Sequence, residues 1–328
     1  MACSNMAQKE LFNNRPVIKR VAKLPPNPEA HAQEGNVKVG RFPSWLHRRL
    51  PRGTGLQDTQ SILRSHKLNT VCEEAKCPNR FECHSKKTAT FLTMGKDCTR
   101  NCGFCDIDFA KNPKPLEEDE PQRIAAAVRD LGLNHVVLTM VARDDLEDGG
   151  ATQLAKIITE VRSLSPRMSI EVLVSDFEGK ESSLDTILAA RPDIFNHNIE
   201  TVRELTPRVR NKATYDRTLF VLDYVKQHAT YPVWIKSGIM AGLGETEEQM
   251  QQTIRDLKAV GCDIITMGQY LQPNPRKLLV KAFISPDQFK RYEDYGNSIG
   301  IKHMYCGPFV RSSYNADLIK DQIEKSLC

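Results

Sequence analysis

Six of the ten cysteines of this chain fall between residues 72 and 105, in two groups of three. The second group, Cys98, Cys102 and Cys105, has the spacing C-x3-C-x2-C. Three thiolates on one short loop can hold three irons of a 4Fe-4S cluster. The fourth iron then lacks a protein ligand and can bind the amino and carboxylate groups of S-adenosylmethionine. An electron from such a cluster cleaves the sulfonium and gives a 5′-deoxyadenosyl radical, which removes hydrogen from an unactivated carbon.

The first group, Cys72, Cys77 and Cys83, has the spacing C-x4-C-x5-C and forms a separate site. Three thiols are again too few to saturate a 4Fe-4S cluster, so a fourth ligand must come from elsewhere in the chain. We interpret this group as the site of a second, incompletely held and therefore labile cluster. A zinc ion is the alternative, with the neighbouring His84 as its fourth ligand.

The composition is that of an ordinary globular protein, with 40% hydrophobic and 27% charged residues. No segment reaches the ~20 apolar residues of a membrane helix, and the N-terminus lacks the apolar core of a secretory signal. We therefore expect a cytoplasmic protein, with an organellar matrix left open and no membrane partner. Nucleic acid is not expected as a partner either, because the chain has no dense Lys/Arg run with interleaved aromatic residues. Residues 1–68 carry a net charge of +8 and the remainder −3. This basic segment either steers an acidic partner or is a solvated arm.

The elements that must position the cysteines follow from residue 88 onward, where apolar β-branched runs alternate with helical segments. The predicted strands are 88–95, 135–141, 169–176, 194–200, 232–240 and 264–271. Strands separated by helices imply right-handed βαβ units and a parallel sheet. With no G-x-G-x-x-G motif, the pattern predicts an α/β fold, a partial (βα)6 TIM-like barrel with active residues at the C-terminal strand ends. A doubly wound sheet is the competing topology.

The predicted organisation has four parts. Residues 1–40 are an extended or flexible lead-in, and 41–87 are an N-terminal extension with a short helix near 57–68 and the first cysteine group. Residues 88–284 are the barrel. Residues 285–328 are C-terminal helices, near 285–299 and 314–326. Within the barrel, Pro121 suits the first turn of a helix, and Thr246 with Gln249 resembles a capping box.

Further motifs resemble those of lipoyl synthases, a family of radical S-adenosylmethionine enzymes. The resemblance runs from about residue 41 to about 318. It includes Pro78 and Asn79 beside the cysteines, and the runs VARDDLEDGG (141–150), IEVLVSDFEG (170–179), FNHNIETV (195–202), KSGIMAGLGET (236–246), GQYLQP (268–273) and CGPFVRSSYNAD (306–317). The two cysteine triplets together with the R-S-S-Y motif at 311–314 separate this family from biotin synthase and other radical enzymes.

The resemblance implies a reaction. Two sulfur atoms are inserted at carbons six and eight of an octanoyl chain that is amide-linked to a lysine of a lipoyl carrier domain. Two molecules of S-adenosylmethionine are consumed per lipoyl group, and the second, auxiliary 4Fe-4S cluster is the sulfur donor. The implied carriers are the acyltransferase subunit of 2-oxoacid dehydrogenases and the glycine cleavage H protein. A flavodoxin or ferredoxin supplies electrons.

The fourth ligand of the auxiliary cluster in the family is the second serine of the R-S-S-Y motif, here Ser313. An alkoxide on iron is more exchangeable than a thiolate, which suits a cluster that must open. Ser312 is the neighbouring candidate, and the sequence does not decide between the two.

Several polar residues at predicted strand ends are candidates to bind S-adenosylmethionine or substrate. Arg143 and Asp144 follow the second barrel strand, although Asp is also common where a helix begins. Asn198 and Glu200 lie on one side of the 194–200 strand, together with Asn196. We expect Asn198 and Glu200 to bind ribose hydroxyls or the amino group.

The loop after this strand carries Arg208 and Arg210, which either pair with a carboxylate or lie solvated on the surface. His197, on the opposite face of the strand, is interpreted as a core histidine. Gly238, Gly242 and Gly244 permit close backbone approach to the nucleoside, or simply a tight turn.

Two departures from the family pattern leave the cluster ligands intact. The family has a stretch with serine, basic residues and histidine where this chain has NPRKLLVKAF (274–283). The family also often has a histidine where this chain has Asn315. We expect these changes to affect substrate-channel contacts and carrier choice. Two other functions remain open at this point: a radical enzyme whose second cluster only transfers electrons, and a zinc module that binds a protein or nucleic acid.

Overall fold

The structure, a computed structural model, describes residues 42–47, 55–85 and 90–313. The predicted lead-in 1–40 and the predicted helix near 314–326 lie outside the described residues, as does Asn315.

The main sheet of the described residues has the spatial order β1-β2-β5-β6-β7-β8-β9-β10. Neighbouring strands are parallel, except that β1 and β2 are antiparallel. The order follows the chain without reversal, so the partial barrel is confirmed and the doubly wound alternative is wrong. The strands are Asn69–Thr70 (β1), Thr90–Thr93 (β2), His135–Met140 (β5), Ser169–Leu173 (β6), Ile194–Asn196 (β7), Trp234–Ala241 (β8), Ile264–Gln269 (β9) and His303–Gly307 (β10).

Strand β10 was not predicted from the sequence. It pairs with β9 from His303 opposite Ile264 to Gly307 opposite Gly268. Only Met304 of its five residues is buried. An edge strand of this kind lacks the continuous apolar run by which the buried strands are recognised.

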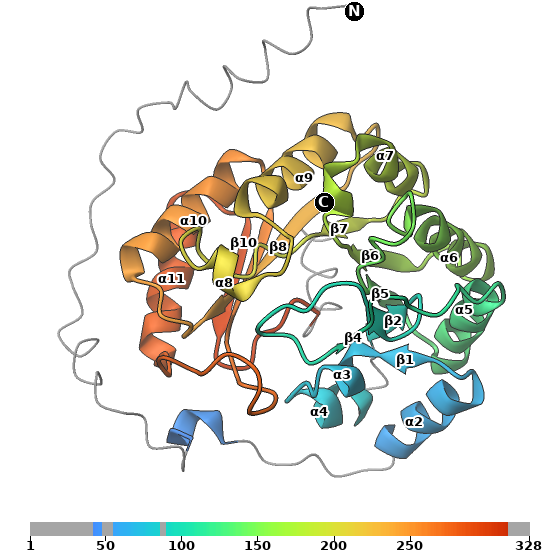
Figure 1. The fold of residues 1–328 in the computed structure, drawn as a ribbon, viewed down its shortest axis with the longest axis horizontal. Helices are drawn as coiled ribbons and strands as arrows, with labels where there is room; N and C mark the ends of the chain where they lie inside the picture. Colours follow the sequence, from blue (N-terminus) through green and yellow to red (C-terminus); the bar gives the residue numbers. More distant parts are fainter. Residues whose placement is uncertain (1–41, 48–54, 86–89, 314–328) are drawn as a thin grey trace, which may run out of the picture. The chain divides into compact units, whose positions relative to one another are not determined.

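Helices wrap the outer side of the sheet (Figure 1). They are Glu120–Leu131 (α5), Ala151–Leu164 (α6), Glu181–Ala189 (α7), Tyr215–His228 (α9), Glu247–Ala259 (α10) and Pro286–Ser298 (α11). Apolar side chains spaced along each inner face, such as Ile124 and Val128 of α5, are fully buried. The capping box is confirmed, because Thr246 and Gln249 exchange side chain-to-backbone hydrogen bonds. Pro121 lies in the first turn of α5 as predicted.

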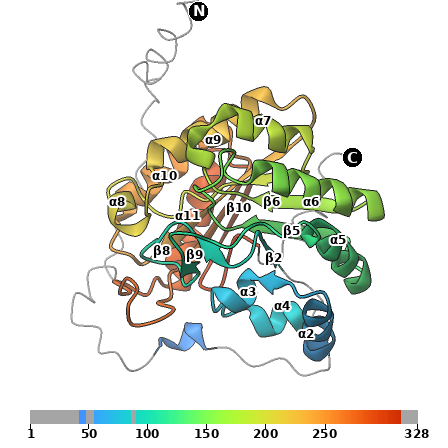
Figure 2. The same cartoon turned by 45° about the vertical axis from the view of Figure 1, so that its right-hand side comes forward.

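The N-terminal extension forms short helices at the β1 end of the sheet (Figure 2). Helix α2 spans Gly55–Ser65, close to the prediction. The chain then forms β1, α3 (Val71–Glu74) and α4 (Arg80–Ser85), and the first cysteine group lies in these two small helices and the turn between them. A short 3-10 helix, η1 (Ser44–Leu46), precedes them.

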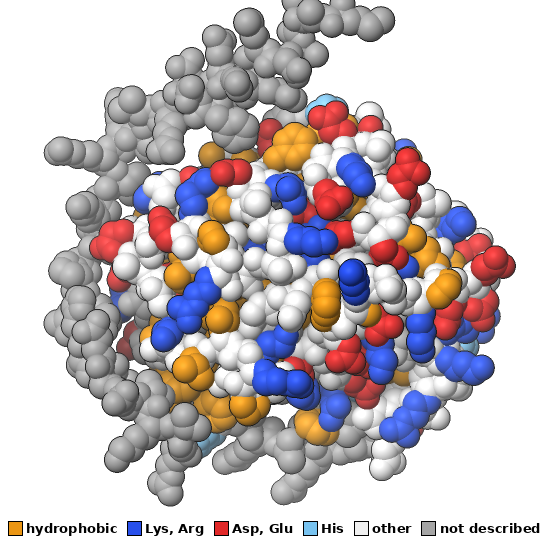
Figure 3. Space-filling view, in the orientation of Figure 1, with side chains coloured by type: hydrophobic (Ala, Val, Ile, Leu, Met, Phe, Trp, Pro, Cys, Tyr) orange, Lys and Arg blue, Asp and Glu red, His pale blue; other side chains and the backbone are white. Residues whose placement is uncertain are grey.

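The surface carries interspersed basic and acidic side chains on the face seen in Figure 3, where hydrophobic side chains gather at the lower left. Large apolar side chains with more than half of their area exposed include Phe42 at 54%, Phe109 at 53% and Leu279 at 57%. Among the described residues, none of the helices combines the length and the apolar character needed to cross a bilayer.

Candidate active site

The second cysteine group lies on the loop that follows β2, at the C-terminal end of the first barrel strand, as predicted. Cys98 ends the short strand β3 (Asp97–Cys98), which pairs with β4 (Asp108–Phe109). The Ala110 amide donates to the Cys98 carbonyl at 2.9 Å and closes the loop. The three thiols are therefore held on a loop with its own two-stranded base, over the centre of the barrel (Figure 1).

Backbone amides point at all three thiols of this loop. The Arg100 amide donates to Cys98 Sγ and the Asn211 amide to Cys102 Sγ, each at 3.4 Å. The Ile107 amide likewise bonds the Cys105 thiol. Burial, with Cys102 and Cys98 close by, raises the pKa of Cys105 to about 12. Iron binds thiolates, so loading this site must release protons, and the backbone amides then stabilise the sulfur charge.

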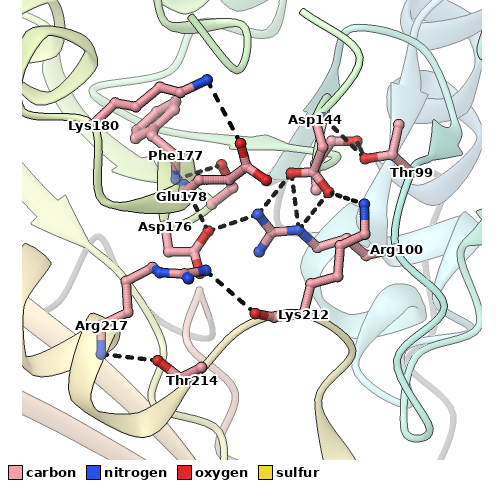
Figure 4. A network of polar contacts seen from close by, with 12 residues as sticks. Thr99, Arg100, Asp144, Asp176, Phe177, Glu178, Lys180, Lys212, Thr214 and Arg217 are labelled. Atoms are coloured by element: carbon pink, nitrogen blue, oxygen red, sulfur yellow. Dashed lines mark hydrogen bonds and ion pairs between the residues drawn. The ribbon is translucent and has the colours of Figure 1, made fainter. Parts of the chain in front are cut away.

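Arg100, inside the C-x3-C motif, fixes the loop to the neighbouring strand ends (Figure 4). Its guanidinium is 5% exposed, and it donates from Nη2 to Asp144 Oδ1 and to Asp176 Oδ1, both at 2.7 Å. Nε adds bonds to both Asp144 oxygens at 3.0 Å. Asp144 follows β5 and Asp176 follows β6. One arginine thus joins the C-terminal ends of three adjacent strands.

A second layer of contacts surrounds this arginine (Figure 4). Lys212 Nζ lies 3.2 Å from Asp144 Oδ2, and Arg217 Nη1 lies 3.2 Å from Asp176 Oδ2. Burial opposes ionisation, but bonds from Arg100 hold the pKa of both carboxyls below their usual range. In this network the three cationic side chains of Arg100, Lys212 and Arg217 contact the two carboxylates of Asp144 and Asp176. The network therefore has a net positive charge beside the cysteine loop.

The first cysteine group is assembled by two short helices that were not predicted. Thr70 caps α3 by accepting the Glu73 amide at 3.3 Å, and Cys72 lies within that first turn. Burial, reinforced by the nearby Cys77 thiol, raises the pKa of Cys72 to about 11. Cys83 lies in α4. Within the described residues, no three His, Cys, Asp or Glu side chains are grouped as a single metal ion would require.

The segments that carry the two cysteine groups are joined by an ion pair. Lys76, next to Cys77, places Nζ 2.8 Å from Oδ2 of Asp106, next to Cys105. The Asp106 carboxylate is 7% exposed and also accepts a hydrogen bond from the Asn274 amide. An ion pair therefore ties together two sites that are separate in the sequence.

The C-terminal segment 308–313 runs between the same two regions. The Asn79 side-chain amide, beside the first cysteine group, donates to the Phe309 carbonyl at 2.7 Å. Further along, the Ser312 hydroxyl donates to Asn198 Oδ1 at 2.9 Å. Ser312 is thus engaged on the barrel side, and Ser313 is the next residue along the chain.

Asn198 and Glu200 were predicted near the end of a strand over 194–200, but β7 ends at Asn196 and both residues lie just beyond it. The Asn198 amide donates to Glu200 Oε1 at 3.0 Å. Glu200 has a φ of +69° and bridges to Ile239 of β8. Burial raises the pKa of both Cys102 and Cys105, and the charge of the Glu200 carboxylate raises it further, so Glu200 lies within electrostatic reach of the second cysteine group. Burial raises the pKa of Glu200 itself.

Asn196 lies deeper in the barrel, where it donates to Glu171 Oε1 at 2.8 Å. The same carboxylate pairs with the fully buried Lys236 at 2.9 Å. His197 is confirmed as a core histidine: Nδ1 lies 2.8 Å from the Val174 carbonyl and Nε2 lies 3.1 Å from the Thr218 hydroxyl.

The other predicted site residues, which are three arginines and Asp144, differ in their burial and in their partners. Arg143 is buried and pairs with Asp145 at 2.8 Å, and its Nη1 has no partner among the described residues. Arg208 is exposed on the short helix α8 (Thr206–Val209), whereas Arg210 is buried near Glu200 and donates to the Thr218 hydroxyl. Asp144 lines a pocket of about 450 Å³ together with Thr99, Asn101, Phe109, Lys111, Asp145, Asn211 and Lys212.

The departing segment 274–283 packs on the second cysteine loop. Lys277 Nζ donates to the Asn101 side chain at 3.2 Å and to the Cys102 carbonyl at 3.3 Å, and the Leu278 amide donates to the Gly103 carbonyl at 2.9 Å. The segment therefore supports the loop of three thiols, which goes beyond the expected role in substrate contacts.

Sequence reasoning missed Arg100, Asp106, Asp176 and Lys76. Arg100 lies in the cysteine motif, Asp106 lies beside it, and Asp176 ends a predicted strand. These positions could have marked the three residues as candidates for the site. The partners of these residues could not be read from the chain because each pair joins distant segments.

Two family models match the chain. That of the Radical SAM superfamily matches residues 92–257, and that of the N-terminal domain of lipoyl synthase of the Radical SAM family matches residues 19–77.

Curated relatives match over nearly the whole chain. The lipoyl synthase of Protochlamydia amoebophila is 61% identical over 310 residues, which cover 94% of this chain and 96% of that one. The lipoyl synthase of Chlamydia muridarum is 50% identical over 293 residues, which cover 89% and 94%.

Among solved structures, Streptococcus suis SuiB bound to S-adenosylmethionine matches with a TM-score of 0.52 at 13% identity. The match covers 70% of this chain and 54% of that chain. At this identity the likeness concerns the fold alone, and it agrees with the partial barrel.

Proposed function

The chain belongs to the lipoyl synthase family of radical S-adenosylmethionine enzymes, and from this premise we propose how its residues divide the reaction. The family inserts sulfur, uses 4Fe-4S clusters with S-adenosylmethionine, and acts on lipoyl carrier proteins. The observation that carries the assignment of residues is the Lys76–Asp106 ion pair, which joins the segments that hold the two cysteine groups.

The donors in this chain fit two clusters. Cys98, Cys102 and Cys105 would hold the first, since each thiol receives a backbone amide suited to a thiolate. Cys72, Cys77 and Cys83 would hold the auxiliary cluster. When bound, the first cluster supplies the electron that cleaves S-adenosylmethionine and the auxiliary cluster supplies sulfur.

We assign Ser313 as the fourth ligand of the auxiliary cluster. The neighbouring Ser312 hydroxyl is engaged with Asn198 at 2.9 Å, which favours Ser313. The Asn79 bond to the Phe309 carbonyl brings this segment to the first cysteine group. A hydroxyl oxygen leaves iron more readily than a fourth thiolate, which suits a cluster that is consumed.

Asn198 and Glu200 are assigned to S-adenosylmethionine, because they follow β7 at its C-terminal end and Glu200 lies within electrostatic reach of Cys102 and Cys105. Arg208, exposed on α8, and Arg143, whose buried Nη1 has no partner in the part of the chain that the structure describes, are secondary candidates for its carboxylate. Asp144 is held by Arg100, so we propose that it positions the cysteine loop.

The substrate is proposed to be an octanoyl-lysine of the 2-oxoacid dehydrogenase acyltransferase or of the glycine cleavage H protein, with sulfur entering at carbons six and eight. A flavodoxin or ferredoxin would reduce the first cluster. Both clusters need reduced thiols, which supports the cytoplasmic location predicted from the sequence. We retain residues 41–87, 88–284 and 285–328 as the functional divisions of the chain.

Cysteine variants test this division of labour. Anaerobically loaded wild-type protein should hold about eight irons per chain. Cys98→Ala should stop formation of 5′-deoxyadenosine. At saturating S-adenosylmethionine, Cys77→Ala should leave that formation intact but stop transfer of sulfur to an octanoyl-lysine peptide. Cys262→Ala, at a buried cysteine outside both groups, is the matched control and should change neither property. Thiolated peptide made by the Cys77 variant would show that the auxiliary role is wrongly assigned.

A further inference from the structure

Ser312 lies at the junction of the two cluster regions. Its hydroxyl donates to Asn198 Oδ1 at 2.9 Å, and Asn198 Nδ2 donates to Glu200 Oε1 at 3.0 Å. Both Ser312 and Asn198 are only partly exposed. The C-terminal segment therefore sets the orientation of the amide that we assign to S-adenosylmethionine.

Two glycines on neighbouring strands make room for this contact. A Cβ on Gly238 of β8 would lie 2.5 Å from Ser312 Oγ and 2.6 Å from Asn198 Oδ1. A Cβ on Gly268 of β9 would lie 2.0 Å from the Val310 carbonyl oxygen. A side chain at either position would clash with the C-terminal segment. The segment therefore packs directly against the backbone of β8 and β9 inside the barrel.

The other end of the segment is fixed at the first cysteine group. Asn79 is 1% exposed and lies between Cys77 and Cys83, and it donates to the Phe309 carbonyl at 2.7 Å. Ser313, four residues further along the segment, is the residue that we assign to the auxiliary cluster. Residues 309–313 thus connect the auxiliary site to Asn198 without any intervening element.

We propose that Ser312 is a positioning residue through which an occupied auxiliary site strengthens the binding of S-adenosylmethionine. The inference rests on the proposed function, in which Ser313 binds the auxiliary cluster and Asn198 binds S-adenosylmethionine. With Ser313 on iron, the segment is fixed at both ends and the Ser312 hydroxyl holds the Asn198 amide in place. When the auxiliary cluster is spent, Ser313 is released and this hold weakens, so the spent enzyme binds S-adenosylmethionine less tightly.

The coupling is tested by equilibrium binding of S-adenosylmethionine to oxidised, cluster-loaded enzyme, where no cleavage occurs. Ser312→Ala should weaken binding roughly threefold to tenfold, the loss expected for one hydrogen bond. Ser313→Ala should also weaken it. Because both changes act through the same contact, the double variant should bind no more weakly than Ser312→Ala alone. Ser298→Ala on α11, an exposed serine, is the control and should bind like the wild type.

A spectroscopic measurement separates positioning from general damage. In reduced Ser312→Ala, the electron paramagnetic resonance signal of the first cluster without S-adenosylmethionine should match the wild type. The change caused by S-adenosylmethionine should require a higher concentration. Unchanged affinity in Ser312→Ala, or fully additive losses in the double variant, would overturn the coupling. A wild type that forms no 5′-deoxyadenosine with dithionite would instead refute the proposed function.

Discussion

At the scale of single residues, the cysteine loop depends on a buried arginine. Arg100 is 5% exposed and contacts Asp144 and Asp176, which are 9% and 0% exposed. Buried charges of this kind are costly when one partner is lost. The arginine also lies between Cys98 and Cys102, so its position and that of the thiols are set together.

Arg100→Met should therefore destabilise the protein by roughly 3 to 5 kcal/mol, because two buried carboxylates lose their main partner. Anaerobic urea unfolding measures this change. Iron analysis should show loss of the first cluster with the auxiliary cluster retained. Arg129→Met, which removes a largely exposed pair with Asp130, is the control and should change little. Wild-type stability and full iron content in the Arg100 variant would contradict this role.

The stability of the fold depends on pH through His197. Burial, assisted by the nearby Arg210 charge, lowers the pKa of His197 to about 4. An exposed histidine has a pKa near ~6.5, so between these values the unfolded chain binds the extra proton. The stability contribution of neutral His197 is thus present above pH ~6.5 and is lost as the pH falls toward 4.

We expect the free energy of unfolding to fall by about 2 kcal/mol more between pH 8 and pH 5 in the wild type than in His197→Gln. Urea unfolding at both pH values measures the difference. Comparison with the variant removes the contribution of other histidines with lowered pKa values, such as His84 and His303. Equal pH dependence in the two proteins would mean that folding does not lower the pKa of His197.

At the scale of elements, the strands β8 and β9 each carry a glycine where the C-terminal segment enters the barrel. Gly268→Ala should displace this segment, because the new Cβ would lie 2.0 Å from the Val310 carbonyl oxygen. Iron content should fall from about eight to about four per chain, while 5′-deoxyadenosine formation persists at saturating S-adenosylmethionine.

Gly307→Ala is the matched control for this change. Its Cβ would meet only the Val310 side chain, at 3.3 Å, which can yield. Full iron content in Gly268→Ala would show that the auxiliary cluster does not need the segment inside the barrel.

The elements also show how far sequence reasoning reaches. Six barrel strands and the main helices were predicted because buried parallel strands and amphipathic helices have strong periodic patterns. Strand β10 and the helices α3 and α4 were missed, since an edge strand and one-turn helices leave too few apolar positions to recognise. The cysteines were found by spacing alone. The Lys76–Asp106 and Ser312–Asn198 contacts were not, because only the folded chain brings those residues together.

At the scale of the whole molecule, charge is divided unevenly along the chain. Residues 1–68 carry a net charge of +8 against −3 for the rest. We propose that this basic segment attracts an acidic carrier domain. Such attraction mainly raises the rate at which the two proteins associate, and salt screens it.

The double variant Lys19→Gln/Arg20→Gln should weaken carrier binding roughly twofold to tenfold at low salt, with the difference disappearing at high salt. Lys156→Gln/Arg167→Gln removes two exposed charges elsewhere and is the control. Binding titrations at two ionic strengths measure both variants. If the two double variants weaken binding equally, the attraction reflects total charge and the N-terminal segment has no special part.

The central claim is that one group of thiols serves radical formation while the other holds the sulfur that is transferred. It is tested most directly by mass spectrometry of an octanoyl-lysine carrier peptide. The enzyme is first loaded with clusters built from a heavy sulfur isotope and then given dithionite and unlabelled S-adenosylmethionine under anaerobic conditions. The account predicts a lipoyl product carrying two heavy sulfur atoms. Formation of 5′-deoxyadenosine with no heavy sulfur in the peptide would contradict it.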